Sequence, residues 1–261
     1  MIFKRHAANL RAQNWSAILL ELGIVILGVF IGTWVANWNQ ERAAKAETRR
    51  MVEQLAPSLR QLGAFFVATR DYHAVTRAYA DTAIAGWRRE PQVSDAEFVI
   101  AAYQASQIDS IGTNGSTFSS ILGADRLRDI DDPKLRADLS VLMSADYSQI
   151  DQSAVDTPYR RNVRRIIPVE IQDRIRTQCG DQPRPGDAGN VVLPRQCRID
   201  LPPTEAAKAA AILRARPEVM EDLQWHVAAV AAFLTYTIAF EDVIKRVESR
   251  GVAGLEQDHD R

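Results

Sequence analysis

Several residue types that carry chemistry are scarce in this sequence. Its 261 residues include two cysteines and four histidines, and they contain no His-Glu-x-x-His pattern, no nucleophile motif and no glycine-rich cofactor fingerprint. The cysteines have no histidine between or beside them, which leaves too few ligands for a closed zinc site. We therefore expect no catalytic residue, no cofactor and no metal, and an enzyme is the less favoured alternative.

The sequence also lacks an excess of either charge. It carries 32 basic and 33 acidic residues, for a net charge of −1. A nucleic-acid-binding domain typically has a basic excess, so we expect no nucleic-acid partner. Hydrophobic residues make up 46% of the chain, which is ordinary for a globular protein with a membrane anchor.

One long stretch has almost no charge. From Ala17 to Ala36 the only formal charge is Glu21, and a helix of this length spans about 30 Å, the thickness of the hydrocarbon core of a bilayer. Three tryptophans flank the stretch where aromatic rings settle at membrane interfaces; they are Trp15, Trp34 and Trp38. We predict a transmembrane helix over residues 15–38. A cleaved signal peptide fits less well, because its apolar run is usually shorter and no small-x-small cleavage site follows.

Two features inside this span have a functional and a neutral interpretation. Gly28 and Gly32 form a G-x-x-x-G pair, which lets two helix backbones approach closely and predicts a dimer or docking face. Glycine is common in membrane helices, so the pair also arises by chance. An ionisable residue such as Glu21 suggests a partner-binding or proton-linked role. Alternatively, Glu21 reaches the headgroups by snorkelling, because it lies near one end of the span.

The orientation of the span depends on the cysteines. Positive charges nearly tie on its two sides, so the positive-inside rule does not decide. Cys179 and Cys197 lie in a segment rich in proline and glycine, where a disulfide would stabilise the fold by about 3 kcal/mol and would persist only in an oxidising compartment. We therefore predict a cytoplasmic N-terminal segment, residues 1–14, and a periplasmic domain. The alternative is two free thiols in a cytoplasmic domain.

Helical periodicity begins directly after the span. One apolar stripe predicts a long helix that packs in a bundle; it comprises Val52, Leu55, Leu59, Leu62 and Phe66, and continues with Tyr72, Val75 and Tyr79. Pro57 predicts a kink or the start of a new helix. A coiled-coil dimer through the same stripe is the alternative, but it has fewer than three clean heptads.

Capping signals place the later helices. Ser94 and Glu97 form a capping box that opens a helix to about Ile108, and Asp132-Pro133 opens another. Residues 110–120 read as a loop. Thr204 is the expected cap of an alanine-rich helix, and Pro217 starts the last helix, which we expect to end near Ser249.

Four arginines fall at one-turn spacing in the densest charged stretch; they are Arg160, Arg161, Arg164 and Arg165. Pairs one turn apart share a helix face. These residues could form an anion patch for lipid headgroups or an acidic partner. The plainer interpretation is a solvated helix face balanced by nearby acidic residues, and we favour it.

The apolar stretch 225–240 raises the question of a second span. It has only sixteen residues, it contains His226, and acidic residues crowd both ends, so a buried core helix fits better. Asp222 lies one turn before His226, but no third ligand has a recognisable spacing, and we expect His226 to be a hydrogen-bonded core residue. His73 near Asp71 is a weaker pair, because residues two apart on a helix point in different directions.

Two stretches resemble a bacterial membrane-protein family, a domain family of unknown function with one N-terminal span that ends in N-W-N-E. The first stretch comprises Glu21, the run IVILGVFIG and Asn37-Trp38-Asn39 with Glu41; the second comprises Thr117-Phe118, Gly123, Leu127, Ile130, Asp132 and Leu135-Arg136. The resemblance covers about a third of the chain, Gln40 replaces the usual glutamate, and the cysteine segment is outside the pattern. It implies a membrane protein and brings no activity or catalytic residue.

Together these features predict an all-α protein with one N-terminal transmembrane helix that continues into a soluble helical bundle with a Pro/Gly-rich disulfide loop. The expected parts are 1–14, the span 15–38, a helical periplasmic domain 39–250 with a loop insert 177–203, and a disordered tail 251–261. The expected function is non-enzymatic, that of an accessory subunit in a bacterial inner membrane. Its partners would be the lipid bilayer and a membrane or envelope protein, or a second copy as a homodimer. The alternative is a sensor-like, ligand-binding helical domain that acts through a partner.

Overall fold

The computed structural model describes residues 15–109, 126–145 and 156–256. Its elements are α2 Trp15–Trp87, α3 Asp95–Gln104, η1 Arg126–Asp129, α5 Pro133–Ser144, α6 Pro158–Ile166, α7 Val169–Cys179, β1 Gln182–Arg184, β2 Asp187–Val192, α8 Pro203–Arg214 and α9 Pro217–Glu256. The predicted all-α class is confirmed, with one short hairpin in addition. The predicted segment 1–14, the loop 110–120 with its Thr117 and Phe118, Gly123 and residues 257–261 lie outside the described residues.

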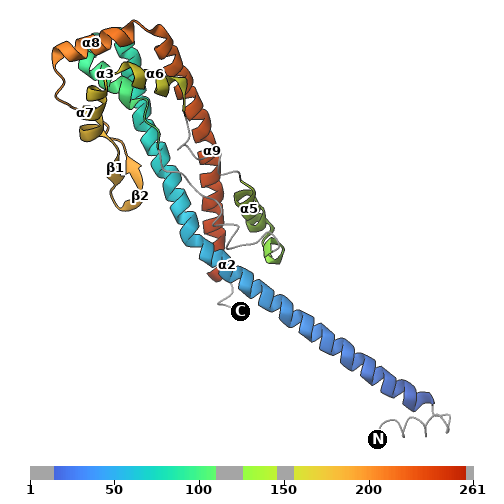
Figure 1. Cartoon of the computed structure of the whole chain (residues 1–261). Coiled ribbons are helices and arrows are strands. Elements are labelled where there is room, and N and C mark those ends of the chain that lie inside the picture. Colours follow the sequence, from blue (N-terminus) through green and yellow to red (C-terminus); the bar gives the residue numbers. More distant parts are fainter. Residues whose placement is uncertain (1–14, 110–125, 146–155, 257–261) are drawn as a thin grey trace.

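Helix α2 runs without interruption for 73 residues, and Pro57 lies inside it. No new helix starts at Pro57, but α2 changes direction where it enters the domain (Figure 1). Proline lacks a backbone N–H and leaves the carbonyl four residues earlier without its helical partner. Both Pro57 and Glu53 are exposed, so water can bond that carbonyl. The proline is therefore accommodated on the solvent side of a continuous helix.

Helix α2 ends in a compact backbone motif. The amide of Glu90 donates to the carbonyl of Ala85 at 3.0 Å and the amide of Arg89 donates to that of Gly86 at 3.2 Å. These two bonds form a Schellman motif, whose turning residue adopts a left-handed conformation. Arg89 takes that place with a φ of 58°. The chain then reverses into α3, whose predicted capping box between Ser94 and Glu97 is confirmed.

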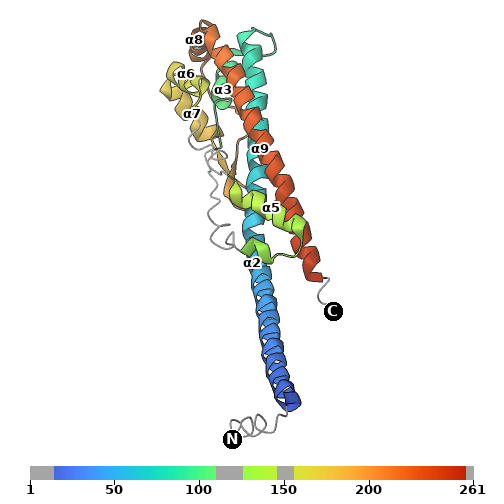
Figure 2. The ribbon, with the colours of Figure 1, turned by 90° about the vertical axis from the view of Figure 1, so that its right-hand side faces the viewer.

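The last helix, α9, returns along α2 in the opposite direction (Figures 1 and 2). The ring of Phe240 lies 6.3 Å from that of Phe66, and Phe233 lies 6.5 Å from the ring of His73. Helix α5 crosses the lower part of this pair, where Asp138 accepts hydrogen bonds from Arg246 and Arg250. The two long helices therefore form the axis of the domain.

Two apolar clusters lie along this axis. The cluster nearer the apolar end of α2 joins α2, α5 and α9 around Leu59, Phe66 and Leu142. The distal cluster joins the end of α2 to α3, α6, α7 and α8 around Tyr103 and Tyr159. The predicted α2 stripe is buried from Leu55 onward. Because this stripe packs inside the domain, it is not free to form the seam of a coiled-coil dimer.

Several predicted boundaries differ from the structure. Helix α3 ends at Gln104 instead of Ile108. Helix α8 begins at Pro203 after Pro202, without a side-chain cap from Thr204, because proline at the first helical position needs no capped N–H. Helix α9 continues to Glu256, beyond the predicted end near Ser249. The Asp132 cap of α5 and the start of α9 at Pro217 are confirmed.

The predicted loop between the cysteines contains an antiparallel hairpin. Gln182 pairs with Val192 and Pro183 with Val191, and Gly186 turns the chain with a φ of 77°. A positive φ of this kind costs glycine little. The predicted disulfide closes the base of the hairpin: Cys179 and Cys197 are bonded, with their Cα atoms 5.4 Å apart. The hairpin is thus held against the side of α2 (Figure 1).

Candidate functional site

The N-terminal part of α2 extends away from the domain (Figure 1). Residues 19–43 are all exposed, although many are large and apolar; Phe30, for example, is 69% exposed. The first buried residue of α2 is Thr48. We call the exposed, largely apolar stretch 19–43 the apolar rod. Such a helix is typical of a membrane anchor or signal segment.

The predicted features of this rod are all at its surface. Trp15, Trp34 and Trp38 are exposed, and the guanidinium of Arg42 lies 4.0 Å from the ring of Trp38. Apart from the neighbouring residues and the local backbone of the same helix, no atom lies within 4 Å of a Cβ built on Gly28 or Gly32. Glu21, Gly28 and Gly32 are seven and four residues apart, which places them on one face of the helix. The two glycines lack side chains, which is the feature that lets a second helix approach closely.

Among the described residues, two helices are long and apolar enough to cross a membrane, α2 and the stretch Pro217–Arg250 of α9. Because of the way in which these two helices pack, their apolar stretches cannot both span the same bilayer. Phe240 lies against Phe66, which is thirty residues beyond Ala36, or about 45 Å along α2. If residues 17–36 lie in a bilayer, the apolar part of α9 is therefore far outside it.

The expectation of a buried core helix holds for only one face of α9. Only 22% of its apolar window is buried. Five exposed residues at steps of three and four form one stripe, which we call the α9 stripe; it comprises Trp225, Ala228, Ala232, Tyr236 and Ala239. Trp225 is 57% and Tyr236 is 64% exposed, and Ile238 beside the stripe is 49% exposed. In the sequence, apolar residues occur on all sides of this helix, and we interpreted that pattern as burial instead of an exposed stripe.

The four arginines do not present one common patch. Arg160 Nη1 donates to the carbonyl oxygen of Ser106 at 3.0 Å, and Arg164 Nη2 donates to Gln107 Oε1 at 2.9 Å. Both side chains thus hold the chain just after α3, where a helix C-terminus attracts positive charge. Arg161 pairs with Asp156 at 3.5 Å, and Arg165 is exposed. Arg161 thus has an acidic partner of the kind that the plainer interpretation expected, whereas Arg160 and Arg164 have structural partners that it did not expect.

The two described histidines belong to a buried polar cluster between α2, α6 and α9. Thr157, the cap of α6, lies 2.9 Å from His226 Nδ1, and Thr69 donates to Asp109 at 3.0 Å. Burial, with smaller effects of His73 and Arg160, lowers the pKa of His226 to about 4. His226 is therefore a neutral, hydrogen-bonded core residue at neutral pH, as expected from the sequence.

The acidic residues near these histidines in the sequence have other partners. Asp222 Oδ2 accepts a hydrogen bond from Asn162 at 2.7 Å, and Asp71 binds Arg184 at 2.8 Å. Within residues 15–109, 126–145 and 156–256, no three His, Cys, Asp or Glu side chains converge in a way that could hold a metal ion. Neither of the two histidine–carboxylate pairs that the sequence spacing offered, and that we did not favour, forms in the described residues.

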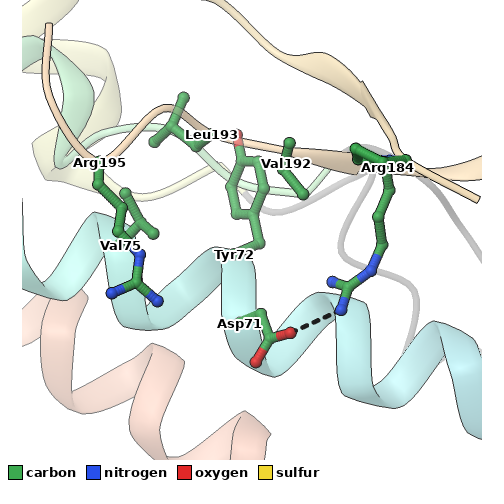
Figure 3. A pocket seen from close by; sticks show the side chains of 8 residues that line it. Asp71, Tyr72, Val75, Arg184, Val192, Leu193 and Arg195 are labelled. Atoms are coloured by element: carbon green, nitrogen blue, oxygen red, sulfur yellow. Dashed lines mark hydrogen bonds and ion pairs between the residues drawn. The ribbon is translucent and has the colours of Figure 1, made fainter.

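A groove separates α2 from the disulfide-closed hairpin (Figure 3). We call it the hairpin groove; its volume is about 410 Å³, and it is lined by Asp71, Tyr72, Val75, Arg184, Pro185, Val192, Leu193 and Arg195. Pockets for small ligands in proteins have volumes of this order. Its residues come from α2 and from the segment 184–195, which have no common pattern in the sequence, so sequence reasoning missed the groove.

Comparisons of the chain with protein-family models, with curated proteins and with solved structures gave no match. The resemblance to the family whose span ends in N-W-N-E therefore stays a prediction.

Proposed function

We propose that this protein is a single-span protein of a bacterial inner membrane that acts as a non-enzymatic accessory subunit. In this proposal α2 crosses the membrane over residues 15–38, the N-terminal segment is cytoplasmic, and the helical domain lies in the periplasm. The domain binds another membrane or envelope protein, or a second copy of itself. The apolar rod of α2 supports the anchor. The Cys179–Cys197 disulfide supports an oxidising, extracytoplasmic compartment for the domain.

The α9 stripe is the observation that carries the interaction role. A water-soluble domain rarely exposes a continuous apolar face of this length, and such a face is typical of a protein–protein interface. Lipid around the α2 span does not reach it, because Phe66, which lies beside Phe240 just beyond the stripe, is about 42 Å along α2 from residue 38, the end of the span. The stripe contains tryptophan and tyrosine, Trp225 and Tyr236, which are residue types enriched in interface centres. We therefore assign a protein partner, and not lipid, as the molecule that covers the α9 stripe.

Charging the stripe tests this function. Ala232→Arg places a guanidinium in the middle of the stripe, and Ala64→Arg makes the same change on an exposed position of α2 away from it. We expect the wild-type protein and Ala64→Arg to migrate as a complex larger than one chain after extraction in a mild detergent. Ala232→Arg should migrate as the single chain. A wild-type protein of monomer size, or equal complexes for both variants, would contradict the interaction role.

The same experiment separates the domain from the span. Gly28→Leu fills the open face of the apolar rod, and Ile24→Leu is a conservative control on the same rod. If the span alone forms the complex, Gly28→Leu dissociates it and Ala232→Arg leaves it intact. In that case the partner is bound inside the membrane, and the role of the α9 stripe is wrong.

A second candidate function is a ligand-binding, sensor-like domain that acts through a partner. The hairpin groove favours it, because a sensor needs a pocket with a few converging polar groups.

A further inference from the structure

The hairpin groove combines an apolar floor with charged ends. Val75 and Leu193 are buried, and with Val192 they line the groove. In Figure 3, the guanidinium of Arg195 lies on one side of Tyr72, and the pair Arg184–Asp71 lies on the other. A ligand in this groove would therefore contact aliphatic side chains along its length and a guanidinium at an end.

The charges in the groove favour one negative group. Arg184 Nη2 is 2.8 Å from Asp71 Oδ2, so that arginine is already neutralised. Arg195 is exposed and leaves the groove with a net positive charge of one unit from its two arginines and one aspartate. A planar guanidinium binds a carboxylate through two parallel hydrogen bonds. Arg195 is thus the group that selects the charged end of a ligand.

The walls of the groove are fixed before any ligand binds. Tyr72 donates its hydroxyl to Asp181 Oδ1 at 2.7 Å, and Tyr79 donates its hydroxyl to the carbonyl oxygen of Pro194 at 2.7 Å. These bonds tie α2 to both arms of the hairpin segment, and the disulfide joins the arms at their base. A pre-formed site loses little conformational entropy on binding, which favours small ligands.

We propose that the hairpin groove binds a small amphipathic carboxylate, with its apolar body over Val75 and Leu193 and its carboxylate on Arg195. The proposal goes beyond the interaction role of the α9 stripe and shares no residue with it. If the binding of a ligand in the groove is disproved, the interaction role of the α9 stripe is unaffected, and the converse also holds.

Titration calorimetry of the full chain in lipid nanodiscs tests this site. The probe is 3-phenylpropionate, and 3-phenylpropanamide is its uncharged control of nearly equal shape; heats from empty nanodiscs are subtracted. We expect the acid to bind at least about tenfold more tightly than the amide, the effect of a hydrogen-bonded charge. Equal binding of the two compounds, or no binding of the acid, overturns the proposal.

Three variants locate the binding. Arg195→Gln should weaken acid binding about tenfold and leave the amide unchanged. Arg198→Gln, a change of an exposed arginine in the same disulfide segment but outside the groove lining, should leave both unchanged. Asp71→Asn should strengthen acid binding, because it frees Arg184 for the ligand. If Arg195→Gln binds the acid as wild type does, or if Arg198→Gln weakens it equally, the assignment to the groove is wrong.

Discussion

His226 shows how burial decides the chemistry of a single residue. Its side chain is only 2% exposed, it bonds Thr157, and the ring of Tyr159 lies 5.6 Å away. His73 on α2 and Arg160 on α6 lie near it, and their electrostatic interaction with the imidazole also lowers its pKa. Water is excluded, so the neutral imidazole is favoured and its pKa is lowered. His226 is therefore a structural residue, and its protonation in mild acid is coupled to unfolding of the domain.

This environment predicts a stability that depends on pH. The pKa of His226 falls from 6.5 to about 4 on folding, so between these values the unfolded chain binds more protons and the folded state loses stability as pH falls. Lowering the pH from 7 to 5 should cost about 2 kcal/mol through this residue. Thermal unfolding of the detergent-solubilised protein at the two pH values measures the loss.

The matched variant is His226→Gln, which keeps a polar side chain opposite Thr157 and cannot titrate. We expect its melting temperature to change less between pH 7 and pH 5 than that of the wild type. An equally steep change in both proteins would assign the pH dependence to another group.

At the scale of elements, the contact of α2 with α3 depends on a missing side chain. A Cβ on Gly86 would lie 2.2 Å from Cδ2 of Phe98. The Phe98 ring cannot yield, because the ring of Trp87 lies 4.9 Å away edge-on and the guanidinium of Arg214 lies 4.8 Å from its centroid. The ion pair of Arg214 with Asp95 at 2.6 Å holds that guanidinium in place. Gly86 therefore sets the distance between the two helices.

We predict opposite effects for alanine at two glycines of α2. Gly86→Ala should lower the free energy of unfolding by about 1–3 kcal/mol through overpacking. Gly63→Ala should raise it by up to about 1 kcal/mol, because alanine is the better helix former and its Cβ would meet Ile244 at an ordinary 3.7 Å. Thermal unfolding of both variants beside the wild type measures the two shifts. A stability gain in Gly86→Ala would show that α3 moves freely on α2.

At the scale of the whole molecule, one helix links the apolar rod to the domain core. Helix α2 runs from Trp15 into both apolar clusters, and ion pairs of Lys45 with Asp131 and of Arg126 with Glu47 brace it where it enters the domain. In our proposal the domain therefore stands on the membrane by a short helical stalk.

The proposed topology predicts the reactivity of the cysteines. In intact cells, a membrane-impermeant alkylating reagent should label Cys179 and Cys197 only after treatment with a reducing agent, because the disulfide lies outside the cytoplasm. Cys179→Ser with Cys197→Ser serves as the control for labelling of other proteins. Thiols that react without reduction, and only after cell lysis, would place the domain in the cytoplasm.

Local patterns in the sequence determined much of this architecture. The apolar run 17–36, the α2 stripe from Leu55, the caps at Ser94 and Asp132 and the disulfide segment each depend on neighbours along the chain, so they were predictable. Predicting these features does not require knowing which distant segment packs against them. Two helix ends that we misplaced, the end of α3 at Gln104 and the continuation of α9 to Glu256, had no local capping signal in the sequence.

Only the tertiary structure decided which surfaces are available for function. Helix α9 is apolar on more than one side, and its position against α2 determines that Trp225 and Tyr236 remain outside. The sequence placed Arg160 and Arg164 on a charged helix face, and only the structure shows that they bond Ser106 and Gln107, just after α3. The hairpin groove exists because Tyr72 and Tyr79 bond Asp181 and Pro194, which holds residues 184–195 near α2, more than a hundred positions earlier in the chain. These sites are products of long-range contacts, which no local periodicity encodes.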